Sequence, residues 1–225
     1  MKITVFDLED WEREGFERLT GEHELTLLAE PLSAENAGRH GDAEAVYGFV
    51  YSSFSEPVMK QLASLKLIAT RSTGFDHIPL GVCREREITV CNVPTYGSNT
   101  VAEHVFGLLL TISHKLEEAI NRTRKGDFSP KGLQGFDLQG KTMGIVGTGG
   151  IGRETIRIAR GFGMDVVAFD IEPDEEAAKQ LNFRYASMDE LLAGSDVVSL
   201  HVPANEKTHH LISRADPWRR LRPTG

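Results

Sequence analysis

The sequence is poor in cysteine, in positive charge and in long apolar runs, and each shortage excludes a class of protein. Its 225 residues include two cysteines, Cys83 and Cys91, which match no metal or redox spacing. The 33 acidic residues outnumber the 25 basic ones, for a net charge of −8. We therefore expect no nucleic-acid partner, because proteins that bind nucleic acids carry a basic surface. The longest uncharged apolar run, Val105–Ile112, is far too short to span a membrane.

The start of the chain also lacks the pattern of a secretory leader. Met1–Asp7 becomes acidic too soon to contain the apolar region of a signal peptide. Cys91 lies in the apolar run Ile88–Val93, so we expect a buried thiol, as suits a reducing compartment. The sequence therefore predicts a cytoplasmic protein with no membrane partner.

The most informative stretch is a glycine-rich turn between two apolar runs, Met143–Val146 and Val166–Phe169. The turn has the pattern G-x-G-x-x-G, formed by Gly147, Gly149 and Gly152. The first glycine permits a tight turn, the second lets the backbone approach a pyrophosphate, and the third lets the helix pack closely on the strand. An amphipathic helical pattern follows, whose first turn can bind a phosphate. These features together predict a dinucleotide-binding turn, and the alternative is a glycine-rich turn without a ligand.

An acid at the end of the second apolar run indicates which dinucleotide would bind. Asp170 follows Gly152 by 18 residues, close to the spacing of a ribose-binding acid. Its carboxylate would accept hydrogen bonds from ribose hydroxyls and repel a 2′-phosphate, and neither Ile171 nor Glu172 adds a positive charge. We therefore expect NAD rather than NADP. The alternative is that Asp170 caps the following helix.

Strand and helix patterns alternate along the first part of the chain, which predicts a parallel sheet covered on both faces. The expected strands are Lys2–Phe6, Val46–Tyr51, Leu65–Thr70 and Ile88–Val93. The expected helices are Glu9–Leu19 and Glu56–Ala63.

A long connecting helix is expected next, beginning with a capping box formed by Thr100 and Glu103 and ending near Gly126. Its apolar stripe would consist of Val101, Val105, Leu108, Leu109, Ile112 and Leu116. We place the domain boundary near residue 98, which gives domains of residues 1–98 and 99–225. In the second domain, strands are expected near residues 143, 166, 183 and 197, with helices from about Pro173 and over Met188–Ala193.

Several longer runs resemble the D-2-hydroxyacid dehydrogenase family and occur in that family's order. They are Arg71–Ile78, Val93–His104, Gly140–Gly152, Gly161–Asp170, His201–Pro203 and Thr208–Ile212. The tyrosine at Tyr96 favours the D-lactate dehydrogenase branch. The resemblance implies an α/β protein with a partial flavodoxin-like substrate domain and a partial Rossmann, doubly wound NAD-binding domain whose last strands are missing. It also implies an active site between the domains, a 2-hydroxy or 2-oxo acid substrate, and a homodimer in full-length relatives.

The resemblance implies roles for matching residues. The N–H groups of Thr73 and Gly74 would hold the substrate carboxylate, and Tyr96 would close over the substrate. From the residues alone, the first two could form an ordinary β-turn and Tyr96 could be a packed loop aromatic.

Other positions would extend the cofactor site beyond the three glycines and Asp170. Val101 would lie against the nicotinamide, although its position also suits a helix core. The remaining contacts would be Gly150 and Ile151 to the pyrophosphate, Val202 and Pro203 to the adenine, and Thr208 to a ribose or phosphate. Thr208 could instead be a helix cap.

The family's chemistry also needs an arginine, a glutamate and a histidine, and the resemblance places all three beyond Gly225. We expect the eight histidines of this sequence to be structural or exposed. The tail arginines Arg214, Arg219, Arg220 and Arg222 are expected on a solvated helix face. The sequence thus predicts an NAD-dependent oxidoreductase acting on a D-lactate-like 2-hydroxy acid, with this chain inactive alone. The alternative is a non-catalytic, corepressor-like NAD-binding module.

Overall fold

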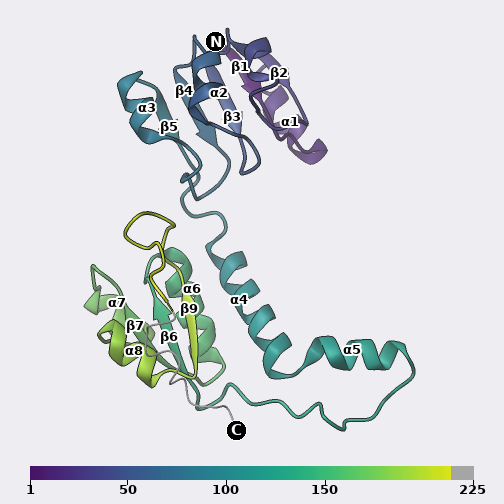
Figure 1. Cartoon of the computed structure of the whole chain (residues 1–225), viewed down its shortest axis with the longest axis vertical. Helices are drawn as coiled ribbons and strands as arrows, with labels where there is room; N and C mark the ends of the chain where they lie inside the picture. Colours follow the sequence, from purple (N-terminus) through teal and green to yellow (C-terminus); the bar gives the residue numbers. More distant parts are fainter. Residues whose placement is uncertain (214–225) are drawn as a thin grey trace. The chain divides into compact units, whose positions relative to one another are not determined.

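The structure, a computed structural model, describes residues 1–213. The chain divides into two compact units, Met1–Tyr96 and Gly97–Gly225, each built on its own parallel sheet (Figure 1). The solvated helix face that we expect for the tail arginines, Arg214 to Arg222, lies outside the described residues. Within residues 1–213, no helix combines the length and the apolar character that crossing a membrane requires.

The sheet of the first unit has the strand order β2-β1-β3-β4-β5, which is the order of flavodoxin-like folds. Its strands are β1 (Lys2–Val5), β2 (Glu24–Leu27), β3 (Ala45–Gly48), β4 (Leu67–Thr70) and β5 (Thr89–Cys91). The four expected strands are confirmed, although each is shorter than its apolar run. Strand β2 was missed because it alternates exposed and half-buried residues at a sheet edge and so forms no apolar run.

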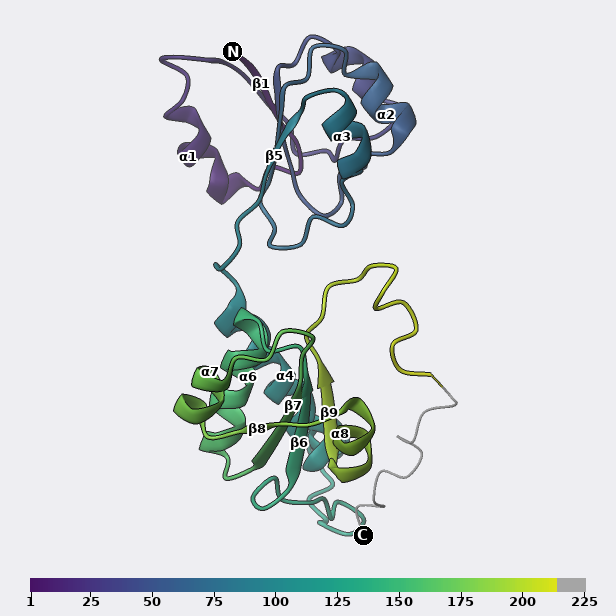
Figure 2. The ribbon, with the colours of Figure 1, turned by 90° about the vertical axis from the view of Figure 1, so that its left-hand side faces the viewer.

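Short helices cover both faces of this sheet. Helix α1 (Arg13–Glu17) lies on one face, while α2 (Glu56–Gln61) and α3 (Leu80–Glu85) lie on the other (Figure 2). Two further 3-10 turns span Asp10–Glu12 and Ala37–His40. The expectation of a buried Cys91 was wrong: Cys91 is exposed at the end of the edge strand β5, whereas Cys83 is buried.

The sheet of the second unit has the order β8-β7-β6-β9, which matches the first four strands of the doubly wound fold. Its strands are β6 (Thr142–Val146), β7 (Asp165–Phe169), β8 (Arg184–Tyr185) and β9 (Val197–Leu200). All four expected strands are therefore confirmed. Among the described residues β9 pairs only with β6, so it forms one edge of the sheet.

Helices also cover both faces of the second sheet (Figure 2). Helices α4 (Ser98–Ser113) and α6 (Gly150–Gly161) share a core with one face, whereas α8 (Met188–Gly194) packs on the other face. A Cβ at Gly144 would lie 2.6 Å from Leu191 Cδ2, so α8 approaches β6 as closely as glycine allows. Helix α7 (Glu175–Leu181) completes the unit.

The expectation of one unbroken connecting helix was wrong. Helix α4 ends at Ser113, and α5 (Leu116–Arg124) begins after Lys115, whose φ of 51° lies in the left-handed region. The expected capping box is also absent. The helix begins at Ser98 rather than after Thr100, and Glu103 Oε1 accepts a hydrogen bond from the side-chain Nδ2 of Asn99 at 2.7 Å.

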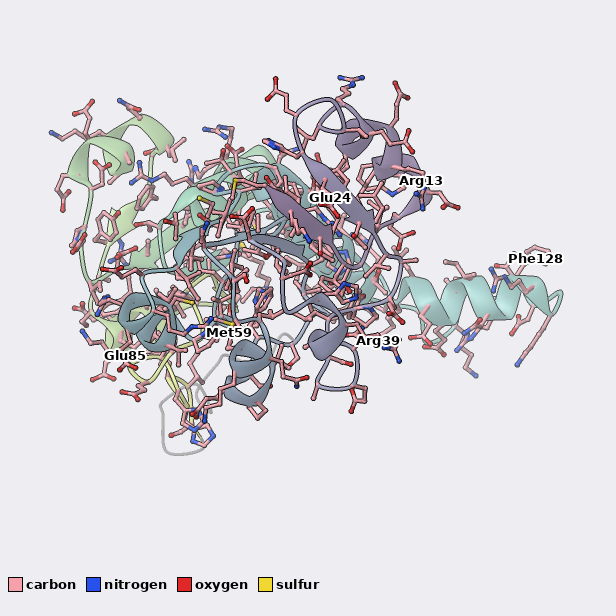
Figure 3. All side chains as sticks on the ribbon, turned by 90° about the horizontal axis from the view of Figure 1, so that it is seen from above. Arg13, Glu24, Arg39, Met59, Glu85 and Phe128 are labelled. Atoms are coloured by element: carbon pink, nitrogen blue, oxygen red, sulfur yellow. The ribbon has the colours of Figure 1, made fainter. Side chains whose placement is uncertain are left out.

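The buried face of α4 differs from the expected apolar stripe. Ala102, Phe106, Leu109 and Ser113 are buried, whereas Leu108 and Ile112 are 55% and 70% exposed. Helix α5 buries no residue and extends away from the sheet of its unit (Figure 1). Figure 3 shows Phe128, which is 79% exposed, beyond the outer end of α5. The second unit therefore exposes apolar side chains on α4 and beyond the end of α5.

Candidate functional site

The glycine-rich turn after β6 is too crowded for side chains at two of its positions. Gly147 has a φ of 95°, and a Cβ there would lie 2.8 Å from the carbonyl oxygen of His201. A Cβ at Gly152 would lie 2.0 Å from the carbonyl oxygen of Gly147. The turn therefore brings α6 against the end of β6 at a distance that only glycine permits.

The other residues of the turn form the beginning of α6. Gly149 is the N-cap and has open space around it, so a ligand could approach its backbone. Gly150, Ile151 and Gly152 occupy the first turn, whose N–H groups have no carbonyl partner within the helix. Such a terminus attracts phosphate groups.

The start of α4 lies beside this turn. A Cβ at Gly150 would be 3.1 Å from Ser98 Oγ, the first residue of α4. Val101 follows in the first turn of α4 and is 44% exposed. The structure therefore places Val101 on an accessible surface of α4 near the glycine-rich turn.

Asp170 lies at the end of β7 and holds the turn by hydrogen bonds. Its Oδ2 accepts from the amide of Thr148 at 2.6 Å and from the Thr148 hydroxyl at 2.9 Å, and its Oδ1 accepts from the Glu172 amide at 3.1 Å. Burial opposes ionisation of this carboxyl most strongly. The hydrogen bonds together outweigh burial, so the pKa of Asp170 lies below its ordinary value. Asp170 is therefore an oriented carboxylate at neutral pH.

Asp170 is not the cap of the following helix. Helix α7 begins at Glu175 rather than near Pro173, and its N-cap is Asp174, whose carboxylate accepts from the Ala177 amide at 3.0 Å. Asp170 thus remains available to the space beside the turn.

A cavity of about 330 Å³ lies where β6, β7 and β9 end. This volume is in the range of small-ligand sites. Most of the cofactor residues expected from the sequence line it, namely Gly147, Gly149, Asp170, Val202, Pro203 and Thr208. Sequence reasoning missed further lining residues, which include Phe169, Lys207 and Leu211. Phe169 and Leu211 lie within the matching runs Gly161–Asp170 and Thr208–Ile212, whereas the only sequence signal of Lys207 is its position beside Thr208.

Two polar residues of the cavity wall are already engaged. The Thr208 hydroxyl donates to the Pro203 carbonyl at 2.5 Å and accepts from the Asn205 amide at 3.0 Å, so it closes the loop after β9. His201 Nε2 lies 3.0 Å from Ser199 Oγ. Burial lowers the pKa of His201, so its imidazole is neutral at pH 7. Neither residue adds charge to the cavity.

In the first unit, the loop after β4 has unused amides. Among residues 1–213, the amides of Thr73 and Gly74 donate a hydrogen bond to no other residue. The loop itself is held firmly. Asn92 Nδ2 donates to the Thr73 carbonyl at 2.8 Å, and Ser72 Oγ donates to the Gly74 carbonyl at 2.6 Å. Adjacent free amides on a fixed loop can bind an anion.

A second cavity, of about 630 Å³, lies in the first unit. Tyr96 is 62% exposed and lines it, together with Trp11, Phe49, Tyr51 and Arg71. Thr73 and Gly74 lie outside this lining.

Arg71 has a structural role in that cavity, which sequence reasoning missed. Its guanidinium donates to the carbonyls of Phe6 and Asp7 at 3.1 and 2.6 Å and lies 3.2 Å from Glu12 Oε1. These contacts join the ends of β1 and β4.

Comparison with known proteins connects these features. Residues 106–216 match the family described as D-isomer specific 2-hydroxyacid dehydrogenase, NAD binding domain. A 2-hydroxyacid dehydrogenase homolog of Zymomonas mobilis is 37% identical over 218 residues, which cover 95% of this chain and 66% of that protein. The apo-structure of D-lactate dehydrogenase from Escherichia coli has a TM-score of 0.79 at 35% identity, covering 95% of this chain and 68% of that one.

The chain belongs to the D-isomer specific 2-hydroxyacid dehydrogenase family. Within it, the chain is D-lactate dehydrogenase-like. D-lactate dehydrogenase from Aquifex aeolicus, crystallised with NAD and lactic acid, has a TM-score of 0.86 at 33% identity, covering 94% of this chain and 63% of that one.

Membership explains the two units as matches to parts of the family's two domains. The fold expected from the sequence, a flavodoxin-like sheet and a partial doubly wound sheet, is confirmed. The chain spans about two thirds of the length of the curated relatives that it matches, for example 66% of the Escherichia coli D-lactate dehydrogenase. Within the described residues, no group of three or more His, Cys, Asp or Glu side chains could hold a metal ion.

Proposed function

We propose that the protein takes part in the NAD-dependent interconversion of a D-lactate-like 2-hydroxy acid and its 2-oxo acid. The observation that carries this proposal is the glycine-rich turn, where a Cβ at Gly152 would lie 2.0 Å from the Gly147 carbonyl oxygen. Beside it, the oriented carboxylate of Asp170 faces a cavity of about 330 Å³. We assign residues 1–98 to the substrate domain and 99–225 to the NAD-binding domain.

The residues of the second unit suit NAD. The free amides of the first turn of α6 would bind the pyrophosphate, and Asp170 would accept hydrogen bonds from the adenosine ribose. The apolar ends of Val202 and Pro203 would flank the adenine, Thr208 would border the ribose or phosphate, and Val101 would lie against the nicotinamide. When bound, NAD supplies the acceptor for the hydride from C2 of the 2-hydroxy acid.

The residues of the first unit suit a carboxylate. The unused amides of Thr73 and Gly74 would hold the substrate carboxylate, as adjacent backbone N–H groups hold anions elsewhere. Tyr96 would cover the substrate from the wall of its cavity. These three residues would bind and orient the acid rather than move its protons.

We further propose that residues 1–225 alone do not turn over substrate. The family's arginine, glutamate and histidine have no matching positions in this sequence. His201 lies at the end of β9 beside Val202 and Pro203, the residues proposed to flank the adenine, so we assign it no acid–base role. The lack of matching positions for these three residues also supports a second candidate function, a non-catalytic NAD-binding module.

Calorimetry and a turnover assay on the 225-residue protein test these proposals together. We expect NAD to bind with a Kd in the range of about 1 μM to 1 mM, and at least tenfold more tightly than NADP. We expect no NADH oxidation above background with pyruvate. If the folded protein did not bind NAD, the proposed cofactor site would be refuted. Steady turnover would refute the proposal that residues 1–225 lack the catalytic group. Turnover by a longer chain that includes the family's arginine, glutamate and histidine would favour the dehydrogenase over the binding module.

We also propose that the protein forms a homodimer through α4 and α5. Leu108 and Ile112 on α4, and Leu116 and Ile120 on α5, are 40% to 70% exposed, which is unusual for a surface without a partner. Isologous contact between two copies would bury these four side chains.

The cytoplasmic location stays a prediction.

Replacing Ile112 by Asp should convert the dimer to a monomer, because a charge would be buried among those four side chains. Light scattering coupled to gel filtration measures this change. Glu117→Gln, at an exposed position in the first turn of α5, is the control and should remain dimeric. A wild-type protein that is monomeric at about 100 μM would contradict the proposal.

A further inference from the structure

Asp170 is the last member of a series of hydrogen bonds that begins at α7. The amide of Asp174 donates to the hydroxyl of Tyr185 at 3.1 Å. That hydroxyl lies 2.8 Å from Thr148 Oγ1, which in turn lies 2.9 Å from Asp170 Oδ2. The series joins the start of α7, strand β8, the glycine-rich turn and the end of β7.

The direction of each bond follows from the number of hydrogens. An ionised carboxylate has none to donate, so Thr148 gives its single hydroxyl hydrogen to Asp170. The Thr148 oxygen can then only accept from the hydroxyl of Tyr185, whose own oxygen accepts from the Asp174 amide. Hydrogen bonds aligned in one direction strengthen one another.

Thr148 is immobilised by these bonds and by its backbone. It is 2% exposed, its amide donates to Asp170 Oδ2 at 2.6 Å, and its carbonyl accepts from Arg153 Nε at 2.7 Å. Arg153 also forms an ion pair with Asp174 at 3.0 Å. The x position of the G-x-G turn is therefore fixed at its N–H, its C=O and its hydroxyl.

The two oxygens of Asp170 consequently differ. Oδ2 receives two hydrogen bonds from Thr148, whereas Oδ1 receives one from the Glu172 amide, and the Ile171 amide also favours the ionised carboxylate. Among the described residues, Oδ1 is thus the oxygen with fewer hydrogen bonds and the better placed acceptor for a ligand hydroxyl.

We propose that Tyr185 is a positioning residue for the cofactor: through Thr148 it fixes the Asp170 carboxylate so that Oδ1 accepts from a ribose hydroxyl. This inference rests on the proposed NAD site and names a residue that sets its selectivity. A carboxylate held in this way cannot rotate away from a 2′-phosphate, so the series also disfavours NADP.

The variant Tyr185→Phe removes only the hydroxyl of this series. Its ring can keep the edge-to-face contact with Phe183, whose centroid is 5.1 Å away. The charged and titratable groups around Asp170 also remain, namely the Arg153–Asp174 ion pair, and Lys207 and neutral His201 on the cavity wall. Tyr47→Phe is the matched control, because the Tyr47 ring makes the same kind of contact, with Phe16 at 5.4 Å, in the other unit.

Two measurements test Tyr185→Phe. Carbon-13 NMR of the carboxyl groups should show a higher pKa for Asp170 than in the wild type, with the Tyr47→Phe control unchanged. Calorimetry should show about fivefold weaker NAD binding, the change that corresponds to one hydrogen bond, and a similar loss of preference over NADP. An unchanged Asp170 pKa in Tyr185→Phe would overturn the inference, whatever happens to affinity.

Two further variants separate positioning from a structural role. Thr148→Ser keeps the hydroxyl and should bind NAD as the wild type does, whereas Thr148→Val should lose at least as much affinity as Tyr185→Phe. In an Asp170→Asn background, Tyr185→Phe should cause no further loss, and a full fivefold loss there would contradict the inference. If the wild type does not bind NAD, the proposed function fails, and the Asp170 pKa alone decides the role of Tyr185.

Discussion

Replacing Gly152 by alanine is expected to abolish NAD binding and to destabilise the second unit by about 3 kcal/mol or more. The added Cβ would lie 2.0 Å from the carbonyl oxygen of Gly147 and 3.1 Å from its carbonyl carbon. Both are backbone atoms at the end of β6, so relief requires α6 to move away from the sheet. That movement would displace the first-turn amides and the Thr148 contacts to Asp170. Calorimetry with NAD and chemical denaturation measure the two effects.

Gly161→Ala is the matched control for this experiment. Gly161 is the last residue of the same helix, and a Cβ there meets nothing within 4 Å. Since glycine costs a helix up to about 1 kcal/mol relative to alanine, this variant should be as stable as the wild type or slightly more so. Normal NAD affinity and stability in Gly152→Ala would show that the turn does not hold α6 as closely as the distances indicate.

Local patterns were sufficient to predict the parallel sheets except for one edge strand, β2. Strands such as Met143–Val146 are buried on both faces and read as apolar runs, whereas β2 alternates half-buried and exposed residues and was missed. The prediction of one unbroken connecting helix was wrong for a different reason. Its apolar residues continue from Leu109 to Leu116, but the left-handed backbone at Lys115 breaks the helix, and no glycine or proline at that position announces the break.

The candidate site was predictable where one short segment defines it. The G-x-G-x-x-G spacing and the acid of Asp170 follow from sequence alone, because the turn requires glycines and the strand length fixes the acid. The hydrogen bonds that hold the turn and Asp170 in place could not be predicted. Tyr185 is 37 residues from Thr148, and only the pairing of β8 with β7 brings their hydroxyls together. Lys207 joins the cavity wall through a loop that has no pattern of its own.

Replacing Asp170 by asparagine should reverse much of the preference for NAD over NADP. At an effective dielectric constant of about 20, a carboxylate roughly 5 Å from a phosphate charge repels it by about 3 kcal/mol. Solvent and salt reduce this repulsion, so we expect the ratio of NADP to NAD dissociation constants to fall by at least about tenfold. NAD itself should bind less tightly, because an amide oxygen is a weaker acceptor for ribose hydroxyls than a carboxylate. Calorimetry with both dinucleotides measures the ratio directly.

The control for this charge effect is Asp165→Asn at the other end of β7. Asp165 pairs with Arg160 at 3.2 Å, its side chain is 77% exposed, and it begins the strand that Asp170 follows. Removing its charge changes the net charge of the protein by the same amount. If both variants lowered the ratio of NADP to NAD dissociation constants equally, the selectivity would come from the overall charge of the protein. If only Asp170→Asn did so, it would come from the carboxylate that Thr148 holds beside the cavity, because both substitutions remove one negative charge.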